Sequence, residues 1–366
     1  MDLEGELEPY RNAEAYRNLQ PATLPNHVEQ HLDFLDINDE GFLLLGSSNL
    51  TGRYWTGSLW YFIEPEAAPN VEKCLTGTDC ESGVCNGKFL NDQQKVIIGE
   101  DSGNIQILAL SEVAEEHTFH FSLSACACDH DDYVCSVGVF KGKSQAVSGG
   151  ADCVIKVWDV ESLVAEHTYR PAHSNQVTSV ATQPTDGSEV FASCSLDGKS
   201  LLWDSRNPKP ASELLKGTAM TAVEWQHSTS HVVGIGGING EVSFVDIRQP
   251  KQKISKITCF PRSVHGLCFD RGSLNKLAVC GDLEVVKVID CMDVANPVVC
   301  YEDGRHNDFV RGLSWHPSSN MLFSCGWDKQ VLTHAPLQVP EEGCVSNMGD
   351  CPVASSPAQN MDINGS

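Results

Sequence analysis

Short apolar runs broken by turn-forming residues occur along most of the chain, and two stretches repeat one pattern of hydrophobic and polar positions. From His130 to Asp159 and from His173 to Asp204, a His is followed by a Ser, by an Asp four residues after the Ser, and by an apolar strand that ends in Trp-Asp. The Asp precedes the Trp by six residues in both stretches. The sequences around it, Gly-Gly-Ala-Asp-Cys and Ser-Leu-Asp-Gly, are typical of tight hairpin turns. The pattern predicts antiparallel strands repeated with a period of about 40 to 45 residues.

The repeated polar residues are expected to form one hydrogen-bonded set in each unit. An Asp in the hairpin turn can accept hydrogen bonds from turn amides and from the His, and the Ser hydroxyl can link that His to the indole N–H of the Trp. A Ser, a His and an Asp together also resemble a hydrolase triad, but a set that recurs and includes a Trp favours a structural role. The predicted structural tetrads are His130, Ser148, Asp152 and Trp158, and His173, Ser193, Asp197 and Trp203.

Weaker copies extend the pattern to seven units. The last copy keeps His306, Ser324 and Asp328 but has His334 at the Trp position, and only the third and fourth units carry the whole polar set. A ring of short sheets closes on itself and leaves only protected sheet edges. We therefore predict an all-β fold, a seven-bladed WD-repeat β-propeller. The seven Trp positions are Trp60, Ile107, Trp158, Trp203, Val245, Ile289 and His334.

The repeats predict a single folded domain at residues 27–335, although 366 residues alone would suggest two domains. Residues 1–26 are interpreted as an N-terminal extension and residues 336–366, which are rich in Ser, Pro, Asn and Gly, as a flexible C-terminal tail. A fourth strand is due directly after His334, where Ala335-Pro336 follows instead. One of the two ends, the N-terminal extension or the C-terminal tail, is expected to supply this closing strand, and the sequence leaves open which.

Composition narrows the classes of function. The chain has 25 basic and 49 acidic residues, and its net charge of −24 disfavours direct binding of nucleic acid or of an anionic membrane and favours basic protein partners. An acidic surface could also serve solubility alone. No apolar run is long enough to span a membrane and the acidic start does not resemble a signal peptide, so a soluble intracellular protein is expected. The 16 cysteines are scattered without a Cys-x-x-Cys motif, so we expect reduced thiols, no metal and no cofactor.

One segment of the first unit is a candidate partner-binding site. Between the apolar runs 41–46 and 57–62 lie ten residues, whereas the other units turn in about two to four. A longer turn that carries Arg53, Tyr54 and Trp55 predicts an anchor, because these residue types are enriched at interface hot spots. The alternative is that Tyr54 and Trp55 continue a strand and pack on a neighbouring blade. Trp60 already occupies the expected core position, which favours the anchor.

The same segment carries a resemblance to a known family. The run from Gly41 to Trp60, with residues 67–70, resembles the first blade of the methylosome WD-repeat subunits. The likeness extends in order from about residue 25 to 335, and it is weak at both ends and at 71–91. Further resembling segments are His130-Asp131-Asp132, 145–149, 155–159, 202–206, Pro208-Lys209-Pro210-Ala211-Ser212, 306–311 and 326–328.

The resemblance implies a non-catalytic subunit that binds the type II protein arginine methyltransferase, with four copies of each protein in a hetero-octamer. It implies a role in symmetric arginine dimethylation of histones and spliceosomal Sm proteins, in the cytoplasm and the nucleus. It further implies that the first-blade loop docks on the N-terminal barrel domain of the methyltransferase, with Trp55 in an apolar pocket and Arg53 and Tyr54 beside it. The acidic propeller would then hold basic, arginine-rich substrates near the enzyme.

Three other interpretations of the function stay open. Trp203-Asp204-Ser205-Arg206 fits the Trp-Asp-x-Arg pattern of propellers that are substrate receptors of cullin ubiquitin ligases, but the tetrapeptide also arises from an ordinary blade end. A free-standing acidic histone chaperone is the second. An enzyme is the third, yet no hydrolase elbow, Walker loop or His-Glu-x-x-His motif occurs, and the glycine-rich segment 234–240 is expected in a hairpin of the fifth blade. We therefore predict no catalytic residues.

Overall fold

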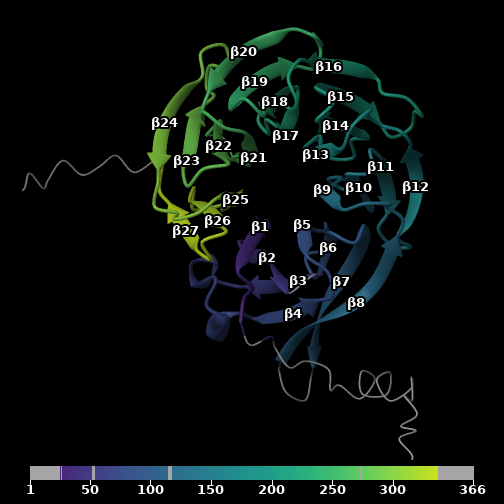
Figure 1. Cartoon of the computed structure of the whole chain (residues 1–366), viewed down its shortest axis with the longest axis vertical. Helices are drawn as coiled ribbons and strands as arrows, with labels where there is room; N and C mark the ends of the chain where they lie inside the picture. The colour runs from purple at the N-terminus through teal and green to yellow at the C-terminus, as the bar shows by residue number, and fades with distance from the viewer. Residues whose placement is uncertain (1–24, 26, 52–53, 114–117, 273, 337–366) are drawn as a thin grey trace, which may run out of the picture. The chain divides into compact units, whose positions relative to one another are not determined.

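The computed structural model describes residues 25, 27–51, 54–113, 118–272 and 274–336. These residues belong to one compact unit that ends at Pro336, and residues 337–366 lie outside the described part. Within the described residues, 27 strands form seven antiparallel sheets around a common axis (Figure 1). This architecture confirms the prediction of a seven-bladed β-propeller.

Consecutive strands build each blade, so that the chain completes one sheet before it enters the next (Figure 1). Blade one contains β1 (His31–Ile37), β2 (Leu43–Thr51), β3 (Tyr54–Phe62) and β4 (Thr76–Cys80). Blade two contains β5 (Val84–Phe89), β6 (Lys95–Glu100), β7 (Asn104–Val113) and β8 (Thr118–Cys128). Blade three contains β9 (Val134–Val139), β10 (Gln145–Gly150), β11 (Ile155–Asp159) and β12 (Val164–Tyr169).

The remaining blades follow the same order, and two short 3-10 helices, η1 (Pro65–Ala67) and η2 (Val71–Lys73), lie between β3 and β4. Blade four contains β13 (Val177–Thr182), β14 (Val190–Ser195), β15 (Lys199–Asp204) and β16 (Ser212–Lys216). Blade five contains β17 (Met220–Trp225), β18 (Val232–Gly237), β19 (Glu241–Asp246) and β20 (Lys253–Thr258). Blade six contains β21 (Val264–Phe269), β22 (Lys276–Gly281), β23 (Val286–Asp290) and β24 (Val298–Asp303), and blade seven contains β25 (Val310–Trp315), β26 (Leu322–Gly326) and β27 (Val331–His334).

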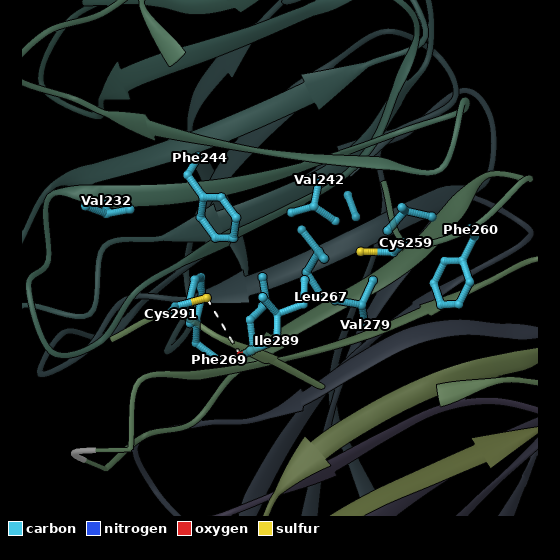
Figure 2. Packing of buried hydrophobic residues seen from close by; sticks show 13 residues of the cluster. Val232, Val242, Phe244, Cys259, Phe260, Leu267, Phe269, Val279, Ile289 and Cys291 are labelled. Atoms are coloured by element: carbon cyan, nitrogen blue, oxygen red, sulfur yellow. Dashed lines mark hydrogen bonds between the residues drawn. The ribbon is translucent and has the colours of Figure 1, made fainter. Parts of the chain in front are cut away.

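The hydrophobic core lies between neighbouring blades. Phe244 on β19 and Val232 on β18 of blade five face Leu267, Phe269 and Ile289 of blade six (Figure 2). Similar clusters join the other blades, because each sheet has two apolar faces and each must be covered by the next sheet. The seven predicted Trp positions all lie on the third strand of a blade and are at most 2% exposed: Trp60, Ile107, Trp158, Trp203, Val245, Ile289 and His334.

Glycines make two of the hairpin turns possible. Gly198 and Gly240 follow the turn residues Asp197 and Asn239 and have φ angles of +77° and +76°. This left-handed region disfavours residues with a Cβ atom, and a Cβ atom would clash with the carbonyl oxygen of Gly217 at Gly198 and of Phe260 at Gly240, so both turns depend on glycine.

The ring closes where blade seven meets blade one, a contact that we call the closing seam. The inner strand β25 lies against β1, the amide of Ile37 donates to Ser314 Oγ at 3.1 Å, and Trp327 Nε1 donates to Asp33 Oδ1 at 3.1 Å. In the described part of the chain the sheet of blade seven has three strands. Both ends that could supply the predicted closing strand, residues 1–26 and 336–366, lie almost entirely outside the described residues, and the domain boundaries stay predictions. No helix among the described residues is long and apolar enough to cross a membrane.

Candidate partner-binding surface

The predicted tetrad residues of blade three lie together in one hydrogen-bonded chain. His130 Nδ1 lies 3.0 Å from Asp152 Oδ2, and His130 Nε2 lies 2.7 Å from Ser148 Oγ. Trp158 Nε1 donates to the same Ser148 oxygen at 2.8 Å. Burial, the largest single influence, raises the pKa of Asp152, but the hydrogen bond and charge interaction with His130, together with the backbone amides of Asp131 and Val154, outweigh it, and the pKa lies below its usual value.

Blade four repeats this arrangement with the same geometry. His173 lies 3.1 Å from Asp197 and 2.7 Å from Ser193, and Trp203 Nε1 donates to Ser193 at 2.8 Å. Ser148 and Ser193 are both fully buried, and each hydroxyl lies between an imidazole and an indole. A substrate therefore has no access to either hydroxyl, and the geometry favours a structural role over nucleophilic catalysis.

Blades one and seven use variants of the same chain. In blade seven, His306 lies 2.9 Å from Asp328 and 2.7 Å from Ser324, and His334 Nε2 lies 2.7 Å from Ser324 Oγ where blades three and four have an indole. The other ring nitrogen of His334 lies 3.0 Å from Asp303 of blade six. In blade one Trp60 donates to Ser58, which contacts Ser47. The sequence signal for these two chains was weaker because their donors differ from the repeated pattern.

The segment predicted as a long turn in blade one is a two-stranded extension, and this part of the prediction is wrong. Strands β2 and β3 are nine residues long, and their pairing continues to Leu50 opposite Trp55 and Thr51 opposite Tyr54. Antiparallel pairing satisfies the backbone hydrogen bonds of these residues, which favours paired strands over an open loop. Only residues 52 and 53 remain for the connection, and Arg53 lies outside the described residues.

The end of this hairpin carries exposed apolar side chains. Tyr54 is 78% exposed, Leu50 is 50% exposed and Trp55 is 38% exposed. Tyr54 and Trp55 thus continue a strand, as the alternative interpretation expected, but they are not buried in a neighbouring blade. We call Leu50, Tyr54 and Trp55 the docking hairpin. An exposed group of large apolar side chains on a rigid sheet is typical of a protein-binding site.

Trp55 also lines the central channel of the ring. The channel is a cavity of about 660 Å³ enclosed by the inner strands. Its lining includes Asp33, Tyr133 and Trp327. Burial raises the pKa of Asp33 to about 6, although hydrogen bonds from Ser48 and Trp327 oppose the shift.

The motif behind the cullin-ligase alternative, Trp203-Asp204-Ser205-Arg206, is explained by a contact between two of its own residues. Arg206 donates to both carboxylate oxygens of Asp204, at 2.8 and 2.6 Å. Arg248 makes the same forked contact with Asp246 at the corresponding end of blade five. The arginine of this motif therefore closes a turn in two blades, which is the ordinary blade end that the sequence allowed.

The described residues provide no clear site for a metal or for dinucleotide binding. They contain no group of three or more His, Cys, Asp or Glu side chains that could hold a metal ion. The 14 described cysteines are unpaired, and they range from buried Cys194 to exposed Cys126 and Cys128. The glycine-rich segment 234–240 forms the end of β18 and the hairpin turn to β19, as expected, and it is followed by a strand.

Comparisons with known proteins agree with this architecture. The model of the WD domain, G-beta repeat, matches residues 121–159, 165–204 and 299–332. One chain of a solved structure described as "Crystal Structure of Mitotic Checkpoint Complex" superposes with a TM-score of 0.66 over 85% of this chain and 89% of its own length. Its sequence is 16% identical, so this likeness concerns the fold alone.

Two curated proteins match almost the whole chain. Protein valois of Drosophila melanogaster is 26% identical over 357 residues, which cover 92% of this chain and 94% of that protein. Methylosome protein WDR77 of Xenopus laevis is 33% identical over 333 residues, which cover 90% of this chain and 96% of that protein. The chain is a propeller with WD repeats and an exposed aromatic hairpin, and it is 33% identical to WDR77 over 90% of its length. It therefore belongs to the methylosome WD-repeat subunits, the family of WDR77.

Proposed function

We propose that this methylosome WD-repeat subunit is a non-catalytic scaffold that binds the type II protein arginine methyltransferase and presents substrates to it. The observation that carries the proposal is the docking hairpin, where Tyr54 and Trp55 are exposed at the end of two paired strands. Strand pairing fixes the backbone, so little conformational entropy is lost when a partner covers these side chains. Trp55 would enter an apolar pocket of the N-terminal barrel domain of the methyltransferase, with Arg53 and Tyr54 beside it.

The complex would contain four copies of each protein and act in the cytoplasm and the nucleus. We expect native mass spectrometry of the complex isolated with this chain to give equal numbers of the scaffold and methyltransferase chains, four of each. Isolation of the chain without a stoichiometric methyltransferase would contradict the proposal and favour a free-standing histone chaperone. Stoichiometric association with a cullin adaptor would favour the ligase alternative.

Substrate presentation rests on the charge of the chain. Histones and Sm proteins have basic, arginine-rich segments, and a chain with a net charge of −24 attracts such segments over a range of about 8 to 10 Å at physiological salt. Attraction of this kind raises the local concentration of a substrate beside the catalytic subunit and involves no reactive group on the propeller.

We expect binding of a histone tail peptide to the purified chain to weaken about tenfold or more between about 50 and about 500 mM NaCl, because salt screens exposed charges. Fluorescence anisotropy at several salt concentrations measures this dependence. A peptide in which glutamine replaces every Arg and Lys is the matched control and should bind only weakly at any salt concentration. An affinity for the basic peptide that does not change with salt would contradict the electrostatic mechanism.

A further inference from the structure

Three aromatic rings connect the docking hairpin to blade seven. The indole of Trp55 meets the imidazole of His31 edge to face, with ring centroids 5.8 Å apart and an interplanar angle of 61°. The same imidazole meets the indole of Trp327 at 5.0 Å and 70°. Trp55 and His31 belong to β3 and β1 of blade one, whereas Trp327 belongs to the turn after β26 of blade seven. The row of rings therefore crosses the closing seam.

Trp327, at the far end of this row, is held on several sides. Its indole N–H donates to Asp33 of blade one at 3.1 Å. The guanidinium carbon of Arg311 lies 4.5 Å from the ring centroid, and Arg311 itself is fixed by Asp282 at 2.9 Å. Phe309 packs against the ring at a centroid distance of 5.8 Å. Cation–π and aromatic contacts of this kind favour one orientation of the indole.

The turn that carries Trp327 is fixed by the polar chain of blade seven. Asp328 accepts hydrogen bonds from the amides of Asn307 at 2.8 Å and Gln330 at 3.1 Å, in addition to its contact with His306. Ala151 and Leu196 occupy the position of Trp327 in the corresponding turns of blades three and four. The turn itself therefore does not require an aromatic residue.

The residues around Trp55 and His31 also restrict where these two rings can lie. A Cβ atom added to Gly83 of blade two would lie 3.1 Å from the Cβ atom of Trp55, closer than ordinary contact, so glycine leaves the space in which Trp55 stands. Nδ1 of His31 is buried and has no hydrogen-bond partner among the described residues. A buried polar atom without a partner costs free energy, and the ring contacts with the two indoles offset this cost.

We propose that His31 and Trp327 are positioning residues for the docking hairpin, so that blade seven determines how tightly Trp55 on blade one binds its partner. A held indole loses less rotational freedom on binding than a mobile one, and preorganisation of this kind raises affinity. A partner that binds Trp55 would then prefer the propeller in which blade seven is packed on blade one. Its binding would in turn stabilise this closing seam. The inference rests on the proposed function for its partner, but the support of Trp55 can be measured without any partner.

The first measurement uses the free chain. In protein labelled with 5-fluorotryptophan, with the Trp55 signal assigned from Trp55→Phe, we expect His31→Ala and Trp327→Leu to narrow the ¹⁹F line of Trp55, because the indole moves faster. His31→Phe keeps a ring at this position and should leave the line near its original width. Trp327→Leu is a mild change for the turn, because blade four has Leu196 there. A Trp55 line unchanged in both His31→Ala and Trp327→Leu would overturn the inference.

The second measurement is a double-mutant cycle with the purified methyltransferase. We expect His31→Ala and Trp327→Leu each to weaken binding roughly threefold to tenfold when Trp55 is present, and to have no further effect in the Trp55→Ala background. An equal loss in both backgrounds would mean that these residues contact the partner directly, which overturns a positioning role. Should Trp55→Ala alone bind normally, the proposed function fails, and the ¹⁹F experiment still decides whether the rings support Trp55.

Two substitutions of the same kind provide a control for stability. His306→Ala and His173→Ala remove the same imidazole from the polar chains of blades seven and four, respectively. We expect both to lower the free energy of unfolding, but only His306→Ala to weaken methyltransferase binding. An equal effect of the two variants on binding would contradict the specific contribution of blade seven.

Discussion

Replacing Trp55 by Ala is expected to weaken binding of the methyltransferase about 30-fold or more, because a hot-spot tryptophan contributes about 2 kcal/mol or more to an interface. The indole is 38% exposed in the free chain, and its partner in strand pairing, Leu50, is 50% exposed. Removing the side chain takes away contact area at the interface and little from the core. Isothermal titration calorimetry with the purified methyltransferase measures the change, and co-purification gives a qualitative answer.

The fold of the Trp55→Ala variant should be intact. Thermal unfolding monitored by circular dichroism should give a midpoint close to that of the original chain, since the seven inter-blade cores do not include Trp55. Leu123→Ala is the matched control, because Leu123 is 58% exposed and belongs to the outer strand β8 of blade two. Equal binding by the Trp55→Ala variant and the original chain would contradict the role of the docking hairpin.

Replacing Trp203 by Ala is expected to lower the free energy of unfolding by about 3 to 5 kcal/mol, the usual cost of removing a fully packed aromatic side chain. The indole of Trp203 is 2% exposed, stacks on Phe191 at a centroid distance of 5.9 Å and an angle of 7°, and contacts Tyr169 at 4.7 Å. Its N–H also donates to Ser193. The substitution would therefore leave a cavity between blades three and four and remove one donor from the tetrad. Urea denaturation monitored by tryptophan fluorescence measures the loss.

Trp203→Phe separates the two effects. A phenyl ring keeps much of the packing but removes the indole donor and fills less of the space, so the expected loss is about 1 to 2 kcal/mol. If Trp203→Ala and Trp203→Phe were equally destabilising, the hydrogen bond to Ser193 would dominate and the packing argument would be wrong. Trp203→Ala should weaken methyltransferase binding only as far as it lowers the folded fraction, because Trp203 lies in blade four, away from the contacts of Trp55.

The repeated part of the fold was accessible from the sequence because its signals are local. The Asp-to-Trp spacing sets the length of one hairpin, and the alternation of apolar residues sets which side chains enter the core. Positions such as Val245 and Ile289 could be assigned although their units lack the polar set, because the period carries over from neighbouring units. The tetrads of blades three and four could be assigned because the spacing of their Ser, Asp and Trp residues is the same in both units.

The backbone conformation of the docking hairpin could not be predicted from local sequence preferences. Residues 47–56 contain Gly, Asn, Ser and Thr, which are typical of a turn, so a long loop was the natural interpretation. Pairing between β2 and β3 overrides these weak preferences, because each added residue pair satisfies backbone hydrogen bonds. Propensity alone therefore assigned Tyr54 and Trp55 to a loop, whereas they belong to strand β3.

By itself, the sequence determined the number of blades, the positions that fill their cores and the polar chains of blades three and four, because spacing within one unit encodes these features. Only the tertiary structure decided that Trp55 is exposed beside His31, that the ring of Trp327 contacts this imidazole, and that His334 contacts Asp303 of another blade. His31 and Trp327 lie near opposite ends of the described chain, and closing the ring brings them within 5.0 Å of each other. No local spacing records such a contact, since it exists only once all seven sheets have packed and the last blade meets the first.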